Sequence, residues 1–294
     1  MFDGMCTAIV TPFKNGYIDF IAYENLINLQ LENNVKALVV LGTTGEAPNI
    51  NLSERTELIK FTKKIVNNKI PIIIGAGTNS TQKTLELVKN AEECGADAVL
   101  LVTPYYNKPT QEGLFHHYKY IAENTKLKII LYNVPGRTGV NMQPETVLKL
   151  ARNFNNIIGL KEANSDINHI DKTISLLKSE IPNFKIYSGN DDRTFYFLCA
   201  GADGVISVAS NIIPHSVAQL CDSIFKNDIK NAAQLHFKLL PIFKGLFIET
   251  NPIPVKTALY ILGYIENEFR LPLVKASDTT FNFIKDLLKK EGLL

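Results

Sequence analysis

The stretch Ile157-Ile158-Gly159-Leu160-Lys161 is a short apolar run that ends on a single lysine, and the recurrence of such runs decides the fold prediction. Similar runs recur along the chain at a spacing of roughly 30 residues, which is the length of one βα unit. Because they are apolar on both faces, they indicate parallel strands that are covered on both sides. The other seven runs are residues 6–10 (CTAIV), 37–41 (ALVVL), 71–74 (PIII), 98–102 (AVLLV), 128–132 (KIILY), 184–187 (FKIY) and 204–207 (GVIS).

The segments between these runs carry helix signals. Ser53 and Ser80 each stand at the start of a segment with helical periodicity. Gly95 and Gly201 fit the position just after a helix, where a positive φ is usual. Eight such units close naturally into a (β/α)8 TIM barrel, an α/β fold that we expect over residues 1–224. A doubly wound open sheet is the alternative, because counting strands does not establish closure.

The last part of the chain predicts helices and no further strands. The helical patterns cover residues 214–226, 229–248, 254–265 and 278–290, and Pro214 and Pro254 suit a first helical turn. One helix is enough to complete a barrel, so the remainder predicts an appended C-terminal helical subdomain over residues 225–294. No Gly-, Ser- or Pro-rich linker precedes it, and we expect it to pack on the barrel.

Composition favours an enzyme or binding protein for a small molecule. The formal net charge is +2 over 294 residues, and the positive residues are scattered, whereas a nucleic-acid or membrane surface usually needs a basic cluster. The four cysteines form no CxxC pair and are expected to be reduced thiols of a cytoplasmic protein. No signal peptide is apparent, and the apolar runs are far shorter than the roughly 20 residues of a membrane-spanning helix.

Lys161 is the most informative candidate for chemistry. Active sites of such barrels lie at the carboxyl ends of the strands, so a lysine that ends an apolar strand would enter the barrel mouth. Poor hydration there disfavours the ammonium form and leaves free amine for attack on a carbonyl. The alternative is an ordinary strand-end lysine that reaches solvent or pairs with Glu162.

Other strand ends supply hydroxyl groups and a second cation. Tyr132, Tyr106 and Thr43 follow three different strands, and their hydroxyls could form a proton relay over one barrel mouth. Each tyrosine could equally be a half-buried aromatic residue with a satisfied hydroxyl. Thr44 lies in a turn that could bind a small carboxylate at a helix N-terminus. Arg137 suits a second substrate carboxylate, although a lone loop arginine is more often solvated.

The histidines and glycines predict neither a metal nor a nucleotide cofactor. His116 and His117 are adjacent in a helical segment and point in different directions, and the other three histidines lie far apart in the sequence. The chain contains no GxGxxG or Walker-type loop. We therefore expect no metal and no organic cofactor.

Three motifs together resemble the dihydrodipicolinate synthase family of the N-acetylneuraminate lyase superfamily. They are residues 42–46 (GTTGE), 132–139 (YNVPGRTG) and 159–163 (GLKEA). The resemblance extends in order from residues 7–13 to residues 251–256. It implies a TIM barrel that condenses pyruvate with L-aspartate 4-semialdehyde, on the route to diaminopimelate and lysine. It also implies a homotetramer, arranged as a dimer of dimers, in which Tyr106 enters a neighbouring subunit's site.

The resemblance also implies a role for each matching residue. Lys161 would form the Schiff base with pyruvate, Tyr132 would donate and accept protons, and Thr43 and Tyr106 would complete the relay. On the substrate side, Thr44 would bind the pyruvate carboxylate and the Ile206 backbone would contact pyruvate. Arg137 would bind the carboxylate of the aldehyde, and Gly189 would also bind substrate.

One region departs from the family pattern. Feedback-inhibited members resemble one another in a lysine pocket that contains histidine and glutamate. Here Asn79 and Tyr105 fit that pocket, but the other positions hold Ala47, Pro48, Leu52, Arg55 and Lys83. A cation at residue 83, in place of the acid, predicts weak or no inhibition by lysine.

Two alternatives to this synthase remain from the sequence. A sialic-acid or 2-keto-3-deoxy-sugar-acid aldolase would keep the chemistry and change the aldehyde, and Arg137 argues against it. A non-catalytic barrel that senses a keto acid belongs to another functional class. The full set of polar strand ends argues against that reading.

Overall fold

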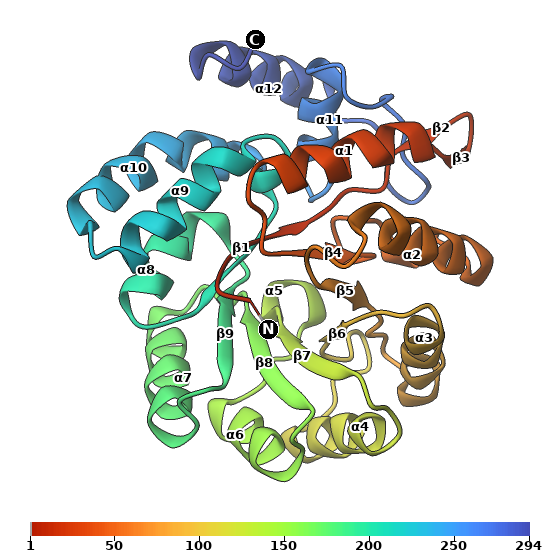
Figure 1. The fold of residues 1–294 in the computed structure, drawn as a ribbon, viewed down its shortest axis with the longest axis vertical. Coiled ribbons are helices and arrows are strands. Elements are labelled where there is room, and N and C mark those ends of the chain that lie inside the picture. The colour runs from red at the N-terminus through yellow and green to blue at the C-terminus, as the bar shows by residue number, and fades with distance from the viewer. Residues whose placement is uncertain (1) are drawn as a thin grey trace.

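The computed structural model describes residues 2–294 and has a ring of eight parallel strands at its centre (Figure 1). The ring closes because the first barrel strand pairs with the last one, with Gly4 opposite Gly204 and Thr7 opposite Ser207. Closure confirms the predicted TIM barrel and excludes the open sheet. In hydrogen-bonded order the strands are β1 (Gly4–Ala8), β10 (Gly204–Ser207), β9 (Lys185–Ser188), β8 (Ile157–Glu162), β7 (Lys128–Asn133), β6 (Ala98–Val102), β5 (Ile72–Gly75) and β4 (Ala37–Val40).

Every predicted run overlaps one of these strands. The largest shift is at β1, which begins at Gly4 and ends at Ala8, two residues earlier than predicted. A two-residue strand pair, β2 (Phe13–Lys14) with β3 (Tyr17–Ile18), was not predicted. Each of its strands is too short to produce a periodic pattern in the sequence.

The strands are buried on both faces, as expected for a parallel sheet covered by helices. Outward residues such as Leu131 and Leu160 belong to the large apolar cluster that includes the helices. Inward residues such as Ile130 and Ile206 form a second, smaller cluster inside the barrel. Because side chains alternate along a strand, Tyr132 and Lys161 share the inward face with this second cluster.

Each barrel strand is followed by one covering helix (Figure 1). Gly95 and Gly201 have φ values of 80° and 101°, which confirms their predicted positions after helices. The second helix begins earlier than its Ser53 signal indicates, because Asn51 caps it by accepting the N–H of Glu54. The covering helices are α1 (Phe20–Glu32), α2 (Leu52–Val66), α3 (Thr81–Glu93), α4 (Gln111–Glu123), α6 (Pro144–Asn153), α7 (Ile167–Glu180), α8 (Thr194–Cys199) and α9 (Pro214–Phe225).

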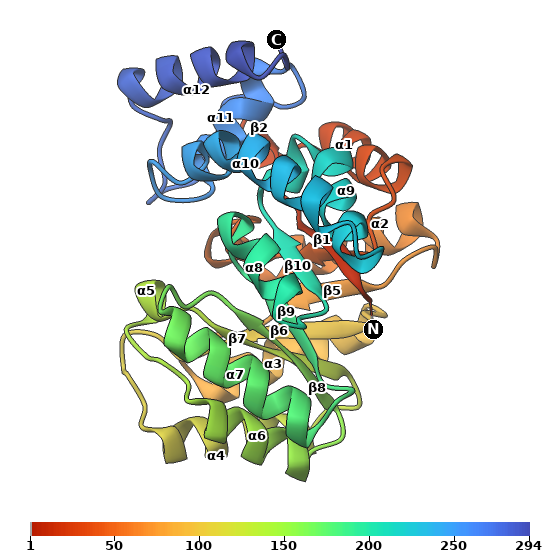
Figure 2. The same ribbon diagram turned by 90° about the vertical axis from the view of Figure 1, so that its left-hand side faces the viewer.

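The chain ends in three further helices, as the helical patterns in its last part predicted. They are α10 (Ile229–Gly245), α11 (Ile253–Ile261) and α12 (Asp278–Lys290). Figure 2 places α11 and α12 beyond α10, at the end of the molecule opposite α4 and α6. The boundary between residues 224 and 225 falls at the end of α9, and the division into two units stays a prediction. None of the helices within residues 2–294 is both long enough and apolar enough to cross a membrane.

Candidate active site

Lys161 and Tyr132 lie side by side inside the barrel mouth. They are register partners on β8 and β7, and both are almost fully buried. The Lys161 Nζ atom lies 4.5 Å from the centre of the Tyr132 ring. The structure therefore brings together the two residues that the sequence singled out as nucleophile and proton carrier.

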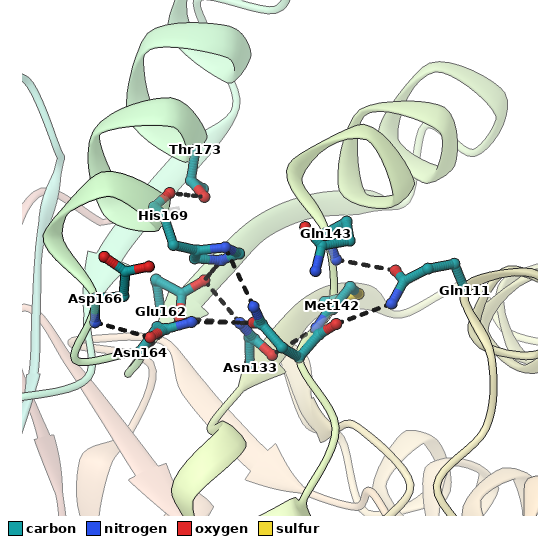
Figure 3. A network of polar contacts seen from close by, with 10 residues as sticks. Gln111, Asn133, Met142, Gln143, Glu162, Asn164, Asp166, His169 and Thr173 are labelled. Carbon is teal, nitrogen blue, oxygen red and sulfur yellow. Dashed lines mark hydrogen bonds and ion pairs between the residues drawn. The ribbon is translucent and has the colours of Figure 1, made fainter.

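Glu162, the next residue along β8, has its side chain on the opposite face of the strand from Lys161. There it joins a polar network with Asn133, Asn164 and His169 (Figure 3). Its carboxylate accepts two hydrogen bonds from Asn133 Nδ2, at 3.1 and 3.0 Å, and one from the backbone N–H of Asn164 at 2.7 Å. His169 Nε2 lies 3.3 Å from the same carboxylate. This arrangement excludes the alternative in which Lys161 pairs with Glu162. It also ties the ends of β7 and β8 together behind Tyr132 and Lys161.

A cavity of about 560 Å³ opens above Lys161. Its wall includes five of the eight predicted site residues, namely Thr43, Thr44, Tyr132, Arg137 and Lys161. A cavity of this size accommodates a small organic substrate. The five residues lie at or just beyond the carboxyl ends of three strands, β4, β7 and β8, as expected for a barrel site.

The other three predicted residues are placed differently. Tyr106 follows β6 with a φ of 72°, and its side chain is 89% exposed, away from the cavity wall of its own chain. Ile206 is fully buried in the inward cluster of the barrel. Gly189 follows β9 and donates its backbone N–H to the Glu162 carbonyl at 2.7 Å.

Asn251, which precedes α11, contacts two of the predicted substrate-binding residues. Its Nδ2 donates to Thr44 Oγ1 at 3.0 Å, and its carbonyl accepts a hydrogen bond from Arg137 Nη2 at 3.3 Å. No local sequence pattern marks Asn251 for this position. Its one signal is that it begins residues 251–256, which form part of the family resemblance.

A buried ion pair stabilises the turn that contains Thr43 and Thr44. Glu46, in the left-handed conformation with a φ of 54°, lies 2.5 Å from Lys256 Nζ of α11. Burial lowers the pKa of the Lys256 ammonium, and the Glu46 carboxylate opposes that shift. The turn continues into a short 3-10 helix, Ala47–Asn49, and α2 begins only at Leu52. Thr44 therefore precedes the short 3-10 helix and lies away from the N-terminus of α2, and its role in binding a carboxylate stays a prediction.

Asp191 is a further buried residue that no sequence pattern indicated. Its Oδ2 accepts the backbone N–H groups of Val208 and Ala209, each at 2.9 Å, and so fixes the segment that follows β10. Burial raises the pKa of this carboxyl, while Ser207, the two backbone donors and the charge of Lys161 oppose the rise. The sequence offered no periodic signal for this contact, because the two partners belong to neighbouring βα units.

The titratable residues do not assemble into a metal site. Within residues 2–294, no three His, Cys, Asp or Glu side chains lie close enough together to hold an ion. His116 is exposed on α4 and His117 is buried, which confirms that they point in different directions. The candidate chemistry of the cavity therefore rests on an amine, a phenol, two threonines and an arginine.

Comparison with known proteins places this chain in a family. A model of the dihydrodipicolinate synthetase family matches residues 1–291. The 4-hydroxy-tetrahydrodipicolinate synthase of Thermotoga neapolitana is 60% identical over 294 residues, covering 100% of both chains. A crystal structure of dihydrodipicolinate synthase from Thermotoga maritima has a TM-score of 0.99 at 59% identity, and covers 100% of both chains. A chloride-inhibited dihydrodipicolinate synthase from Acinetobacter baumannii, complexed with pyruvate, has a TM-score of 0.96 at 42% identity, again covering 100% of both chains. On this similarity of sequence and fold along its whole length, the chain belongs to the dihydrodipicolinate synthetase family.

Proposed function

We propose that this protein condenses pyruvate with L-aspartate 4-semialdehyde to give 4-hydroxy-tetrahydrodipicolinate, through a Schiff base on Lys161. The observation that carries the proposal is the buried Lys161 amine, which faces inward beside Tyr132 at the base of a cavity. A poorly hydrated amine next to a proton carrier is what imine formation requires. The relatives named for this reaction support the choice of substrates.

The reaction would begin with addition of the Lys161 amine to the pyruvate ketone. Tyr132, with Thr43 and Tyr106, would carry protons while water leaves and the imine forms. Loss of a methyl proton would give an enamine, and the enamine carbon would attack the aldehyde of the second substrate. Cyclisation by that substrate's own amine would then release Lys161. The iminium provides the electron sink, so the proposal includes no metal or organic cofactor.

Carboxylate recognition would be divided between the two sides of the cavity. Thr44 would bind the pyruvate carboxylate, and the Ile206 backbone and Gly189 would contact the same substrate. Arg137 would hold the carboxylate of the aldehyde and so orient it for attack. Asn251 supports this division, because it contacts both Thr44 and Arg137 and fixes the two sides relative to each other.

Tyr106 requires a second subunit in this scheme. Its side chain is 89% exposed in the single chain, which suits a residue that enters a neighbour's site. We therefore propose a homotetramer, as a dimer of dimers, acting in the cytoplasm. We also propose that lysine inhibits weakly or not at all, because Arg55 and Lys83 line the cavity region where an ammonium group would have to bind.

The proposal is tested by product analysis with competing aldehydes. The purified protein is given pyruvate with either L-aspartate 4-semialdehyde or N-acetylmannosamine, and the products are identified by mass spectrometry. The proposal requires rapid turnover of the semialdehyde and little turnover of the sugar. Preference for the sugar would identify a sialic-acid aldolase, and turnover of neither would identify a keto-acid-binding barrel.

A further inference from the structure

The loop that carries Arg137 is held at both of its ends by asparagines. Arg137 stands on α5 (Pro135–Thr138), and its exposed guanidinium donates to a backbone carbonyl at 3.3 Å. Asn133 precedes the loop and Asn141 follows it, and Asn133 Nδ2 donates to Asn141 Oδ1 at 2.8 Å. Asn133 Oδ1 also accepts the backbone N–H of Met142 at 3.0 Å. The position of Arg137 therefore depends on this pair of asparagines.

The carboxylate of Glu162 is the main acceptor beside these asparagines (Figure 3). Glu162 is 1% exposed, and its two oxygens accept hydrogen bonds from Asn133 Nδ2 and from the backbone N–H of Asn164. His169 Nε2 lies 3.3 Å from the same carboxylate. A buried carboxylate needs hydrogen bonds to replace its lost hydration, and an ionised carboxylate only accepts. Each neighbour of Glu162 must therefore be a donor.

The hydrogen bonds of Asn141 determine the tautomer of His169. Asn141 Oδ1 accepts from the Nδ2 groups of Asn133 and Asn164, at 2.8 and 3.1 Å. The other end of this amide, Nδ2, lies 3.3 Å from Nδ1 of the histidine. An amide nitrogen only donates, so Nδ1 accepts, and the ring hydrogen is on Nε2 and faces Glu162. Glu162 thus acts through His169 on the orientation of the Asn141 amide.

We propose that Glu162 is a positioning residue that sets the affinity for the aldehyde substrate by fixing the loop of Arg137. The inference rests on the proposed function, in which Arg137 binds the carboxylate of that substrate. Lys161 and Tyr132 are register partners in the ladder of β7 and β8, so their places do not depend on the loop. Loss of the network should therefore weaken recognition of the aldehyde more than capture of pyruvate.

The variant Glu162→Gln tests the carboxylate while keeping the size of the side chain. Its amide group places a donor where a carboxylate oxygen accepted the Nε2–H of His169. The histidine can then accept only if its hydrogen moves to Nδ1, where it meets the donating amide group of Asn141. Turning that amide over would point its nitrogen at the donor group of Asn133. The mismatch therefore reaches both ends of the Arg137 loop.

A second substitution, Asn141→Asp, supplies the missing acceptor. Aspartate at this position can accept from Asn133, from Asn164 and from the Nδ1–H of His169. The histidine Nε2 is then free to accept from the glutamine amide at residue 162. The double variant Glu162→Gln/Asn141→Asp thus moves the carboxylate from one side of the histidine to the other and keeps the net charge. Restored function in this variant is a result that a purely structural role of Glu162 does not predict.

The test combines steady-state kinetics with borohydride trapping of pyruvate over a range of pyruvate concentrations. We expect Glu162→Gln to raise the KM for L-aspartate 4-semialdehyde by about tenfold and to trap pyruvate with the concentration dependence of the parent. Glu162→Gln/Asn141→Asp should return this KM to within about threefold of the parental value. Glu123→Gln, at an exposed position of α4, makes the same chemical change away from the network and should behave as the parent does.

Thermal unfolding shows whether each variant folds. If Glu162→Gln does not fold, Asn141→Ala takes its place, because it removes the contact at the loop end and leaves the carboxylate, and it should raise the same KM. An unchanged KM for the semialdehyde in the folded variant would overturn the inference. Equal losses of trapping and of semialdehyde turnover, not restored by the double substitution, would also overturn it. A parent protein that does not use the semialdehyde would overturn the proposed function and this inference together.

Discussion

Lys161 and Tyr132 are paired across β8 and β7, and the lysine amine lies 4.5 Å from the centre of the tyrosine ring. The pair owes its position to strand register, which sets neighbouring residues of parallel strands beside each other on the inward face. On the outward face, Glu162 and Asn133 are joined by two hydrogen bonds at the same level of the same strands. Contacts on both faces of the barrel wall thus fix the backbone of Lys161 and Tyr132, the residues that carry the amine and the phenol.

Replacing Tyr132 with phenylalanine should slow the reaction and leave pyruvate binding nearly intact. The ring and its packing remain, but the hydroxyl that would carry protons is lost. We expect kcat to fall by about a hundredfold to a thousandfold, with little change in the KM for pyruvate. Steady-state kinetics measure both values. Tyr120→Phe, on the exposed face of α4, is the control, and a normal kcat in Tyr132→Phe would remove the phenol from the mechanism.

Subunits with complementary defects should restore activity when they are mixed. Tyr106→Phe lacks the crossing hydroxyl and Lys161→Met lacks the amine, so each homo-oligomer should be nearly inactive. In a mixed oligomer, a subunit with Lys161 can receive Tyr106 from a Lys161→Met neighbour. Co-expression followed by an activity assay should recover a substantial part of the parental rate. If Tyr106 serves its own chain, no mixture will exceed the residual activity of the Tyr106→Phe protein.

Lysine should have little effect on the rate. Its ammonium groups would have to approach Arg55 and Lys83, and no acid of the described chain lines that region to pair with them. The measurement is a steady-state assay at a fixed pyruvate concentration and increasing lysine. Arginine at equal ionic strength controls for general salt effects. Strong inhibition at sub-millimolar lysine would contradict this prediction.

Stability should decline in mild acid because of His117. Burial lowers the pKa of His117 from 6.5 to about 4, so the unfolded chain binds a proton between these values that the folded chain does not. The stabilisation by the neutral imidazole is complete above pH 6.5 and is lost as the pH falls towards 4. The loss should be on the order of 3 kcal/mol.

Thermal unfolding as a function of pH measures this contribution. His117→Gln should show a flatter profile between pH 6.5 and 4 than the parent. His116→Gln is the matched control, because the adjacent side chain is exposed on the same helix and should leave the profile unchanged. Parallel profiles for the parent and His117→Gln would assign the acid sensitivity to other groups.

Local patterns were sufficient to predict the eight strands and the helices between them. The strands are buried on both faces, so each appears as an apolar run, and Gly95 and Gly201 mark two of the helix ends. The carboxyl ends of these runs predicted that Lys161, Tyr132, Thr43, Thr44 and Arg137 lie at one mouth, and all five line one cavity. What the pattern did not reveal was closure, since pairing between β1 and β10 joins the first and last barrel strands, which share no local signal.

The parts of the site that escaped prediction depend on contacts between distant segments. Glu46 meets Lys256, and Thr44 meets Asn251, each across more than 200 residues of sequence. Arg55 looks like an ordinary helical arginine in the sequence, and its burial without a carboxylate becomes visible only when α2 is packed against β5. Sequence periodicity predicts which face of a helix or strand is buried, but it does not predict which residue pairs with a buried charge.

The most direct measurement of the central claim is reductive trapping of pyruvate followed by peptide mass spectrometry. Borohydride reduces an imine to a stable amine, so the mass of the reduced pyruvate should appear on the peptide that contains Lys161. Lys161→Met should trap nothing, whereas Lys230→Met, which removes an exposed lysine of α10, should trap as the parent does. Modification of another lysine instead, such as buried Lys256, or normal turnover by Lys161→Met, would contradict the account.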